Sequence, residues 1–321
     1  MNIHAAVVRS FDGPPRYEPF DLPAPSDGDQ ALVDMIAVGL HPRVRSGASG
    51  SHYTSTGKLP MVPGIDGVGR REDGRLVYFV ADDDLTGPMA TQTVIDTRRS
   101  IVLPDGVDVL KVAAAMNPAM SSWVALRRRV PIKTGQSVLV LGATGNAGQM
   151  AIQVAKRLGA GRVVGAGRDQ ARLAELPGIG ADATVALTND ADATAAALAT
   201  AASEVDLVVD YLWGKPASEA IMALLRARTD RSRALDWIQI GAMAGPTIEL
   251  PSVALRSANL RLQGNGQGAV SAEGYLAELP SLVDEIDAGA IALRPSSKRL
   301  ADVHAVWATT DSPGQRTVLV P

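Results

Sequence analysis

Three glycines at a fixed spacing are the part of this sequence that most directly suggests chemistry. Gly142, Gly145 and Gly148 follow the apolar run "SVLVL" and open an amphipathic segment. In this pattern the first glycine permits a sharp turn, the second lets a pyrophosphate approach the backbone, and the third lets a helix pack on the strand. The helix N-terminus then offers free N–H groups to the phosphates. We therefore predict a dinucleotide-binding loop made of Gly142, Ala143, Thr144, Gly145, Asn146, Ala147 and Gly148.

The end of the next apolar run selects the coenzyme. An acid at that place accepts hydrogen bonds from the adenosine ribose and repels a 2′-phosphate. Here the residues are Gly167 and Arg168, with Arg172 one helical turn later. Gly167 would leave room, and a guanidinium can bind phosphate through two hydrogen bonds. The sequence thus predicts NADPH rather than NADH, the alternative being that Arg168 is a solvated residue at a helix start.

Composition excludes several other kinds of site. The 321 residues contain no cysteine and four scattered histidines, which excludes disulfides, thiolate nucleophiles and Cys-ligated zinc. The net charge of −3 gives no reason to expect a nucleic-acid partner. No signal peptide and no apolar run of ~20 residues is recognisable, so we expect a cytoplasmic protein without a membrane partner.

The length of the chain suggests two domains, since single hydrophobic cores stop growing near ~250–300 residues. The pattern of expected secondary structure also changes along the chain. Strand-like segments at 3–10, 31–40, 75–80 and 90–96 are separated by Pro, Gly and Asp, which predicts a small barrel or sandwich. From residue 117, six short apolar runs begin at 137, 162, 183, 206, 237 and 260, the first five separated by helical segments such as 189–204. Alternation of this kind predicts a parallel sheet covered on both faces. A helix over 274–289 and a strand over 317–321 end the chain.

Several segments together resemble the medium-chain dehydrogenase/reductase superfamily, in its zinc-free quinone oxidoreductase-like or enoyl reductase-like branch. They are "LPMVPGIDGVG" at 59–69, the segments 101–126 and 138–160, and "GQRTVLVP" at 314–321. The resemblance implies an α/β fold: a GroES-like β-barrel catalytic domain from residues 1–116 and 268–321, and an inserted Rossmann domain, a doubly wound parallel sheet, over 117–267. The active site would lie in the cleft between them.

The departures from the family pattern concern the metal. Zinc-dependent relatives carry a cysteine and a Gly-His-Glu where this chain has "VGLHPRVRSG" and Gly64-Ile65-Asp66. Without a Lewis acid, alcohol oxidation is disfavoured, whereas hydride addition to a conjugated acceptor remains accessible. We therefore expect an NADPH-dependent reductase of a small electrophilic substrate, either a quinone or an α,β-unsaturated carbonyl compound. A reductase of one biosynthetic enone and a non-catalytic NADPH-binding redox sensor are the alternatives.

The resemblance also assigns residues to the site. Tyr53 falls where enoyl reductases place a tyrosine that can donate a proton, and His41 lies in the loop near the nicotinamide, where it could donate a hydrogen bond. His52 is expected to be exposed. Further residues are expected to border the coenzyme. Ser121 precedes the first strand of the Rossmann domain, and the others lie at the carboxyl ends of later strands: Tyr211, Leu212, Trp213, Gly241, Ala242, Met243 and Asn265. Relatives commonly pair their Rossmann sheets through the last strand, here 259–264, which implies a homodimer.

The assignment of Arg168 predicts a coenzyme preference. We expect NADPH to bind at least ~10-fold more tightly than NADH, or ~1.4 kcal/mol, because charge-assisted contacts to phosphate are strong. Arg168→Ala should weaken NADPH binding and leave NADH binding almost unchanged. Titration of both coenzymes measures the dissociation constants, and equal values for the wild-type protein would contradict the prediction.

Overall fold

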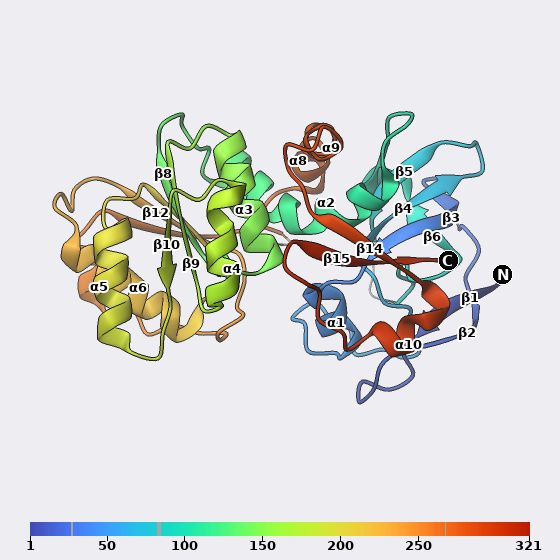
Figure 1. Ribbon diagram of the computed structural model, residues 1–321. Helices are drawn as coiled ribbons and strands as arrows, with labels where there is room; N and C mark the ends of the chain where they lie inside the picture. The colour runs from blue at the N-terminus through green and yellow to red at the C-terminus, as the bar shows by residue number, and fades with distance from the viewer. Residues whose placement is uncertain (27, 82–84, 267) are drawn as a thin grey trace. The chain divides into compact units, whose positions relative to one another are not determined.

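The structure is a computed structural model that describes residues 1–26, 28–81, 85–266 and 268–321 (Figure 1). The chain forms two compact units, one from Met1–Asn117 with Leu276–Pro321 and the other from Pro118–Tyr275. Residue 267, at which the predicted insertion ends, lies outside the described residues. Each unit has its own sheet and core and is described by itself below.

The unit Pro118–Tyr275 contains a six-stranded parallel sheet. The strand order is β10-β9-β8-β11-β12-β13, so the chain builds outward from β8 in one direction and then in the other. This is the doubly wound Rossmann order, and the predicted fold class is confirmed. The strands are β8 (Ser137–Leu141), β9 (Arg162–Gly167), β10 (Ala183–Ala186), β11 (Leu207–Asp210), β12 (Leu235–Gln239) and β13 (Leu260–Gly264).

Helices cover both faces of this sheet, with α3 and α4 on one side and α5 and α6 on the other (Figure 1). The helix predicted over 189–204 is α5, and the Asp190 side chain caps it by accepting from the Ala193 N–H at 3.0 Å. The helical elements are α3 (Asn146–Arg157), α4 (Gln170–Glu175), η3 (Leu176–Ile179), α5 (Ala191–Ala202), α6 (Gly214–Ala227) and α7 (Ser252–Arg256). Helix α2 (Val109–Val124) crosses the boundary between the units and continues into a π-helical turn, η2 (Ala125–Arg129).

The unit formed by the two chain ends is mainly antiparallel. Its larger sheet has the order β14-β15-β3-β4-β5-β7, with β6 also paired to β3, and β1 and β2 form a separate pair. Among the strand pairs of the described residues in this unit, only β14 and β15 run parallel. The strands are β1 (Asn2–Val7), β2 (Arg16–Asp21), β3 (Gln30–Gly39), β4 (Asp66–Arg71), β5 (Leu76–Val80), β6 (Gln92–Asp96), β7 (Ser100–Val102), β14 (Arg294–Arg299) and β15 (Gln315–Val320).

Short helices complete this unit: α1 (Pro42–Ala48), η1 (Thr97–Arg99), α9 (Leu279–Asp287), η4 (Leu300–Asp302) and α10 (Val303–Val306), while α8 (Ala272–Leu276) lies at the boundary. The prediction of a single helix over 274–289 is wrong, because the structure has two helices in this region, α8 and α9. Pro280 stands in the first turn of α9, where its missing N–H is not needed. The same ring in the interior of a longer helix would remove a hydrogen bond and clash with the preceding turn.

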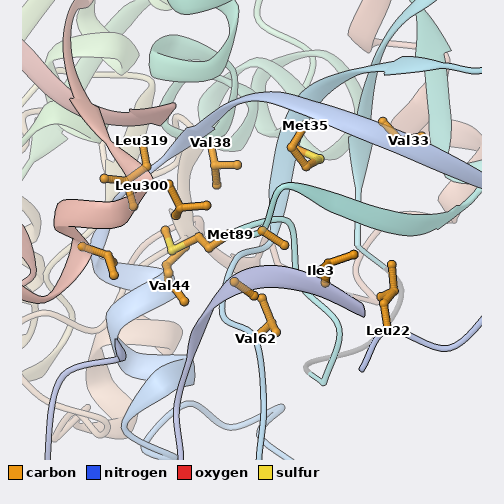
Figure 2. Close-up of a cluster of buried hydrophobic side chains, with 14 of the residues drawn as sticks. Ile3, Leu22, Val33, Met35, Val38, Val44, Val62, Met89, Leu300 and Leu319 are labelled. Carbon is orange, nitrogen blue, oxygen red and sulfur yellow. The ribbon is translucent and has the colours of Figure 1, made fainter. Parts of the chain in front are cut away.

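The core of the chain-end unit joins residues that are far apart in sequence. Figure 2 shows Ile3 of β1, Met35 and Val38 of β3, and Leu319 of β15 in one cluster with Met89. All five side chains are buried. The strands of both chain ends therefore share one hydrophobic core, which is dominated by aliphatic and methionine side chains.

One buried arginine stabilises the end of the parallel sheet opposite to the glycine loop. Arg228 is 3% exposed, and its guanidinium donates to the carbonyl oxygens of Ser203 (2.7 Å), Val205 (2.9 Å) and Ala234 (3.1 Å). These carbonyls lie in the connections that lead into β11 and β12. The side chain thus ties together two loops that would otherwise leave buried acceptors unpaired.

Arg228→Met should lower the free energy of unfolding by about 3 kcal/mol, because a methionine fills the volume but leaves one buried and two partly buried carbonyls without this donor. Urea denaturation at neutral pH measures the change. The matched control is Arg226→Met at the exposed end of α6, two residues before Arg228, which should stay within about 0.5 kcal/mol. Equal stability of the two variants would contradict a structural role for Arg228.

Candidate functional site

The glycine loop lies between β8 and α3, at the carboxyl edge of the parallel sheet. Gly142 has φ +85°, and a Cβ there would lie 3.2 Å from Leu212 Cδ2. A Cβ on Gly148 would lie 2.6 Å from Ala143 Cα, so α3 could not pack this closely with a larger residue. Gly145 is exposed, and a Cβ there would meet only the Gly142 carbonyl oxygen at 3.5 Å. Packing therefore explains two of the glycines, while the third leaves an open approach to the backbone.

The residues after β9 differ in how they are engaged. Among the described residues, Arg168 is exposed and has no hydrogen-bond or ion-pair partner. Arg172 is already occupied: it donates to the Thr144 carbonyl oxygen at 3.1 Å and lies 3.4 Å from the Asp169 carboxyl. The volume above Gly167 is filled by the Thr144 side chain, because a Cβ on Gly167 would lie 2.6 Å from Thr144 Cγ2. The glycine thus makes room for Thr144, which differs from the interpretation that it makes room for a phosphate.

A strained turn follows β11, next to the glycine loop. Trp213 has φ +52° and ψ −157°, and it is the only described non-glycine residue with positive φ. Backbone in this region costs about 1–3 kcal/mol for a side-chain-bearing residue and persists only where neighbours impose it. Asp210 imposes it here: one carboxyl oxygen accepts from the N–H groups of Leu212 (2.7 Å) and Trp213 (3.0 Å), and the other from Trp237 Nε1 (3.0 Å). Burial raises the pKa of Asp210, and these hydrogen bonds oppose that shift.

The loop after β12 packs against the same turn. A Cβ on Gly241 would lie 2.6 Å from the Tyr211 carbonyl oxygen. The N–H groups of Met243 and Ala244 donate to the carbonyls of Tyr211 (3.2 Å) and Leu212 (2.8 Å). Met243 itself is 72% exposed. The structure therefore brings the predicted residues Gly241, Ala242 and Met243 together with the turn at Tyr211–Trp213.

A polar cluster joins α2 to the ends of β11 and β13. Ser121 Oγ and the Tyr211 hydroxyl are 3.0 Å apart, and Asn265 Nδ2 donates to the Ser121 carbonyl oxygen at 2.9 Å. Burial raises the pKa of Tyr211 to about 12, with hydrogen bonds from Ser121 and Ser122 opposing the shift. Tyr211 consequently stays protonated at every physiological pH. Ser121 thus contacts both of the other residues that the sequence placed near the coenzyme, Tyr211 and Asn265.

The chain-end unit contains a second polar cluster, centred on Asp66. The side chain of His41 is 3% exposed, and its Nε2 lies 3.3 Å from Asp66 Oδ1. Asn117 Nδ2 donates to the same oxygen at 3.2 Å, and the Tyr78 hydroxyl donates to Oδ2 at 2.8 Å. Burial lowers the pKa of His41 and outweighs the opposing effect of Asp66, while Arg316 and Arg43 lower it further.

The resulting protonation state restricts what His41 can do. Because Asp66 Oδ1 acts as an acceptor for Asn117, Nε2 of the neutral ring must carry the hydrogen that faces it. The N–H of His41 is thus used inside the protein, which differs from the expectation that it donates to coenzyme or substrate. Asp66, Tyr78 and Asn117 were not predicted as site residues. The only sequence signal was an acid that replaces the metal motif of relatives at Gly64–Asp66.

Tyr53 lies in the loop after α1. It is 76% exposed, its ring centroid is 4.3 Å from that of His52, and its hydroxyl has no hydrogen-bond partner among the described residues. His52 is half-buried rather than exposed, so that expectation is wrong. Its Nδ1 lies 2.9 Å from Thr54 Oγ1, which also accepts from Arg43 at 2.7 Å. Burial, with a smaller effect of Arg43, lowers the pKa of His52 to about 4.

No group of three or more His, Asp or Glu side chains within the described ranges could hold a metal ion. No helix in the described part of the chain is long and apolar enough to cross a membrane.

Comparison with known proteins gives the class. A family model described as zinc-binding dehydrogenase matches residues 147–265. The probable NADPH-dependent quinone reductase tdiC of Emericella nidulans is 30% identical, in an alignment that covers 99% of this chain and 100% of that protein. The NADPH-dependent alkenal/one oxidoreductase of Arabidopsis thaliana is 26% identical over 50% of this chain and 46% of its own length.

A solved structure agrees with the fold. A mycobacterial quinone oxidoreductase superposes with a TM-score of 0.82 at 22% identity, covering 99% of this chain and 100% of the other. A glycine loop on a doubly wound sheet, inserted in a unit built from both chain ends, is the architecture of medium-chain dehydrogenases and reductases. The chain belongs to the medium-chain dehydrogenase/reductase superfamily, in its quinone oxidoreductase-like branch.

The lowered pKa values predict how stability depends on pH. His52 titrates at about 4 in the folded protein and near 6.5 when unfolded, so the unfolded chain binds protons first as the pH falls. Stability should be fully present above pH ~6.5 and decline as the pH falls toward ~4. Urea denaturation at pH 7 and pH 5 measures this, and His52→Gln should reduce the difference. An imidazole of His52 that titrates near ~6.5 by NMR would contradict the prediction.

Proposed function

We propose that this protein is an NADPH-dependent, zinc-independent reductase that delivers hydride to a quinone or an α,β-unsaturated carbonyl compound. The observation that carries the proposal is the unpartnered, exposed Arg168 directly after β9, beside a glycine loop whose Gly145 is free of packing constraints. An arginine in this place favours a 2′-phosphorylated coenzyme. The name of the full-length relative, a probable NADPH-dependent quinone reductase, supports the same coenzyme and a quinone acceptor.

The proposed coenzyme contacts follow the carboxyl edge of the parallel sheet. The pyrophosphate would be held by the loop Gly142–Gly148 and the start of α3, and the 2′-phosphate by Arg168, with Arg172 fixing the loop through Thr144. Residues after β11, β12 and β13 would border the nicotinamide half, together with Ser121: Tyr211, Leu212, Trp213, Gly241, Ala242, Met243 and Asn265. When bound, the coenzyme supplies the hydride, and the protein supplies position and a proton.

The proton is assigned to Tyr53. Its hydroxyl is exposed and unengaged among the described residues, whereas the N–H of neutral His41 points at Asp66. Reduction of an enone creates an enolate that needs a proton, and a phenol remains protonated at neutral pH. His41 is proposed as a polar residue of the site that accepts rather than donates. The alkenal/one oxidoreductase among the relatives supports enones as substrates beside quinones.

The assembly, the location and the metal content are also proposals. Strand β13 is an edge strand of the six-stranded sheet, and neighbouring α7 exposes Val253 (52%) and Leu255 (51%), which supports a homodimer paired through β13. Light scattering at micromolar concentration should give twice the chain mass. We also propose a cytoplasmic location, and the net charge of −3 gives no reason to expect a nucleic-acid or membrane-surface partner. The lack of cysteine supports a zinc-free enzyme, and elemental analysis of untagged protein should show substoichiometric zinc.

A steady-state assay tests the function directly. NADPH oxidation should be measured with a panel of quinones and enones, with and without a chelator, and with NADH in place of NADPH. We expect turnover with at least one acceptor, unaffected by the chelator and faster with NADPH at subsaturating concentration. NADPH binding without turnover on any acceptor would favour a redox sensor instead.

Tyr53→Phe should lower kcat for enones by ~10²-fold or more, the scale of a positioned acid. With quinones the loss should be much smaller, because a hydroquinone anion takes a proton from water. The dissociation constant for NADPH serves as the internal control and should stay nearly constant. An unchanged kcat with both substrate types would remove Tyr53 from the mechanism and leave His41 as the candidate.

A further inference from the structure

Asn265 has a buried hydrogen-bond acceptor that nothing in the protein satisfies. The side chain is 4% exposed, its Nδ2 donates to the Ser121 carbonyl oxygen at 2.9 Å, and its Oδ1 is buried without a partner in the part of the chain that the structure describes. Leaving a buried acceptor unpaired costs about 1–3 kcal/mol. Such a group in a native protein calls for an explanation, and a bound ligand is one.

The identity of the free atom is fixed by its neighbour. The two ends of an amide side chain are assigned from their hydrogen-bond partners. The Ser121 carbonyl can only accept, so the amide end that faces it must be the NH₂ group. The unpartnered end of Asn265 is therefore the oxygen. A ligand that completes this site must bring a hydrogen-bond donor.

The position of Asn265 in the sheet limits which donor that can be. Its backbone N–H donates to the Gln239 carbonyl oxygen at 2.8 Å, which fixes the residue at the carboxyl ends of β12 and β13. The glycine loop follows β8, and Arg168 follows β9 on one side of it, whereas β11, β12 and β13 lie on the other side. A dinucleotide with its pyrophosphate at β8 and its adenosine at β9 extends its nicotinamide half toward Asn265.

We propose that Asn265 Oδ1 accepts a hydrogen bond from the carboxamide NH₂ of the nicotinamide and thereby fixes the orientation of the ring. The inference rests on the proposed coenzyme and adds the group that this residue recognises. The carboxamide is the part of the nicotinamide ring that carries N–H donors. Ser121 couples this contact to the rest of the cluster, since its carbonyl holds the Asn265 amide and its Oγ lies 3.0 Å from the Tyr211 hydroxyl.

A coenzyme analogue tests the contact without any turnover. In the 3-acetylpyridine analogue of NADP⁺ a methyl group replaces the NH₂, so the donor is lost while the carbonyl remains. Dissociation constants for NADP⁺ and for the analogue should be measured by quenching of tryptophan fluorescence. We expect the wild-type protein to bind NADP⁺ about 10-fold more tightly, the effect of losing one hydrogen bond to a buried group.

Asn265→Ala should bring the ratio of the two constants to within about 3-fold, by weakening NADP⁺ and leaving the analogue nearly unchanged. The matched control is Asn259→Ala, at the opposite end of β13, where the exposed Asn259 amide donates to the Ser232 carbonyl. This control should keep the wild-type ratio. Thermal melting of the variants without coenzyme checks that each is folded.

Two outcomes would overturn the inference: equal affinity of the wild-type protein for both coenzymes, or an unchanged ratio in Asn265→Ala. The first outcome is measured on the wild-type protein, so it cannot be attributed to a folding defect of a variant. Failure of the proposed coenzyme looks different, because neither NADP⁺ nor the analogue would then bind. Failure of the proposed reaction would show in the turnover assay and not in these dissociation constants. Tight NADP⁺ binding with no discrimination would leave the proposed coenzyme standing and remove Asn265 as its carboxamide contact.

Discussion

The buried carboxyl group of Asp210 is the interaction on which the carboxyl edge of the parallel sheet depends. Three donors converge on it, two from the turn that follows and one from Trp237 on the neighbouring strand β12. The turn then carries the backbone acceptors on which the loop after β12 is built. Leu212 also closes over Gly142 of the glycine loop. One acid thus sets the relative positions of three loops, and the strain at Trp213 is the energetic cost of that arrangement.

Asp66 plays a similar structural role in the other unit. It too is buried at the end of an element, and it too gathers donors from separate segments, here His41, Tyr78 and Asn117. A buried acceptor with several donors is satisfied in only one geometry, which makes it a means of specifying structure. Each unit therefore uses one buried aspartate to hold residues from separate segments in fixed positions. In zinc-dependent members of the superfamily the corresponding region carries metal ligands, whereas here His41, Tyr78 and Asn117 hydrogen-bond to Asp66 in that place.

The sequence predicted the features that local pattern controls. Strands buried on both faces are short apolar runs, so the order of β8–β13 along the chain was correct, and glycine spacing located the loop. Strand β14, "RPSSKR", is polar and largely exposed, and β2 contains a proline, so neither has the alternation that marks a strand. The polar cluster around Asp66 could not be predicted from the sequence, for another reason. Asp66 meets partners 12, 25 and 51 residues away in sequence, and no spacing rule encodes such contacts.

The antiparallel pairing of β15 with β3 has a consequence for biosynthesis. Val318 and Leu319 pair with Gly39 and Val38, and the Arg316 guanidinium reaches the Leu40 carbonyl across 276 residues of chain. On the ribosome, the unit Pro118–Tyr275 is complete before β15 has been made, so it can fold while Val38 and Gly39 at the end of β3 still lack this partner. An unpaired strand edge is a template for association with other chains. The pairing thus joins the first and last segments of the chain, so the sheet of the chain-end unit can be completed only after synthesis has ended.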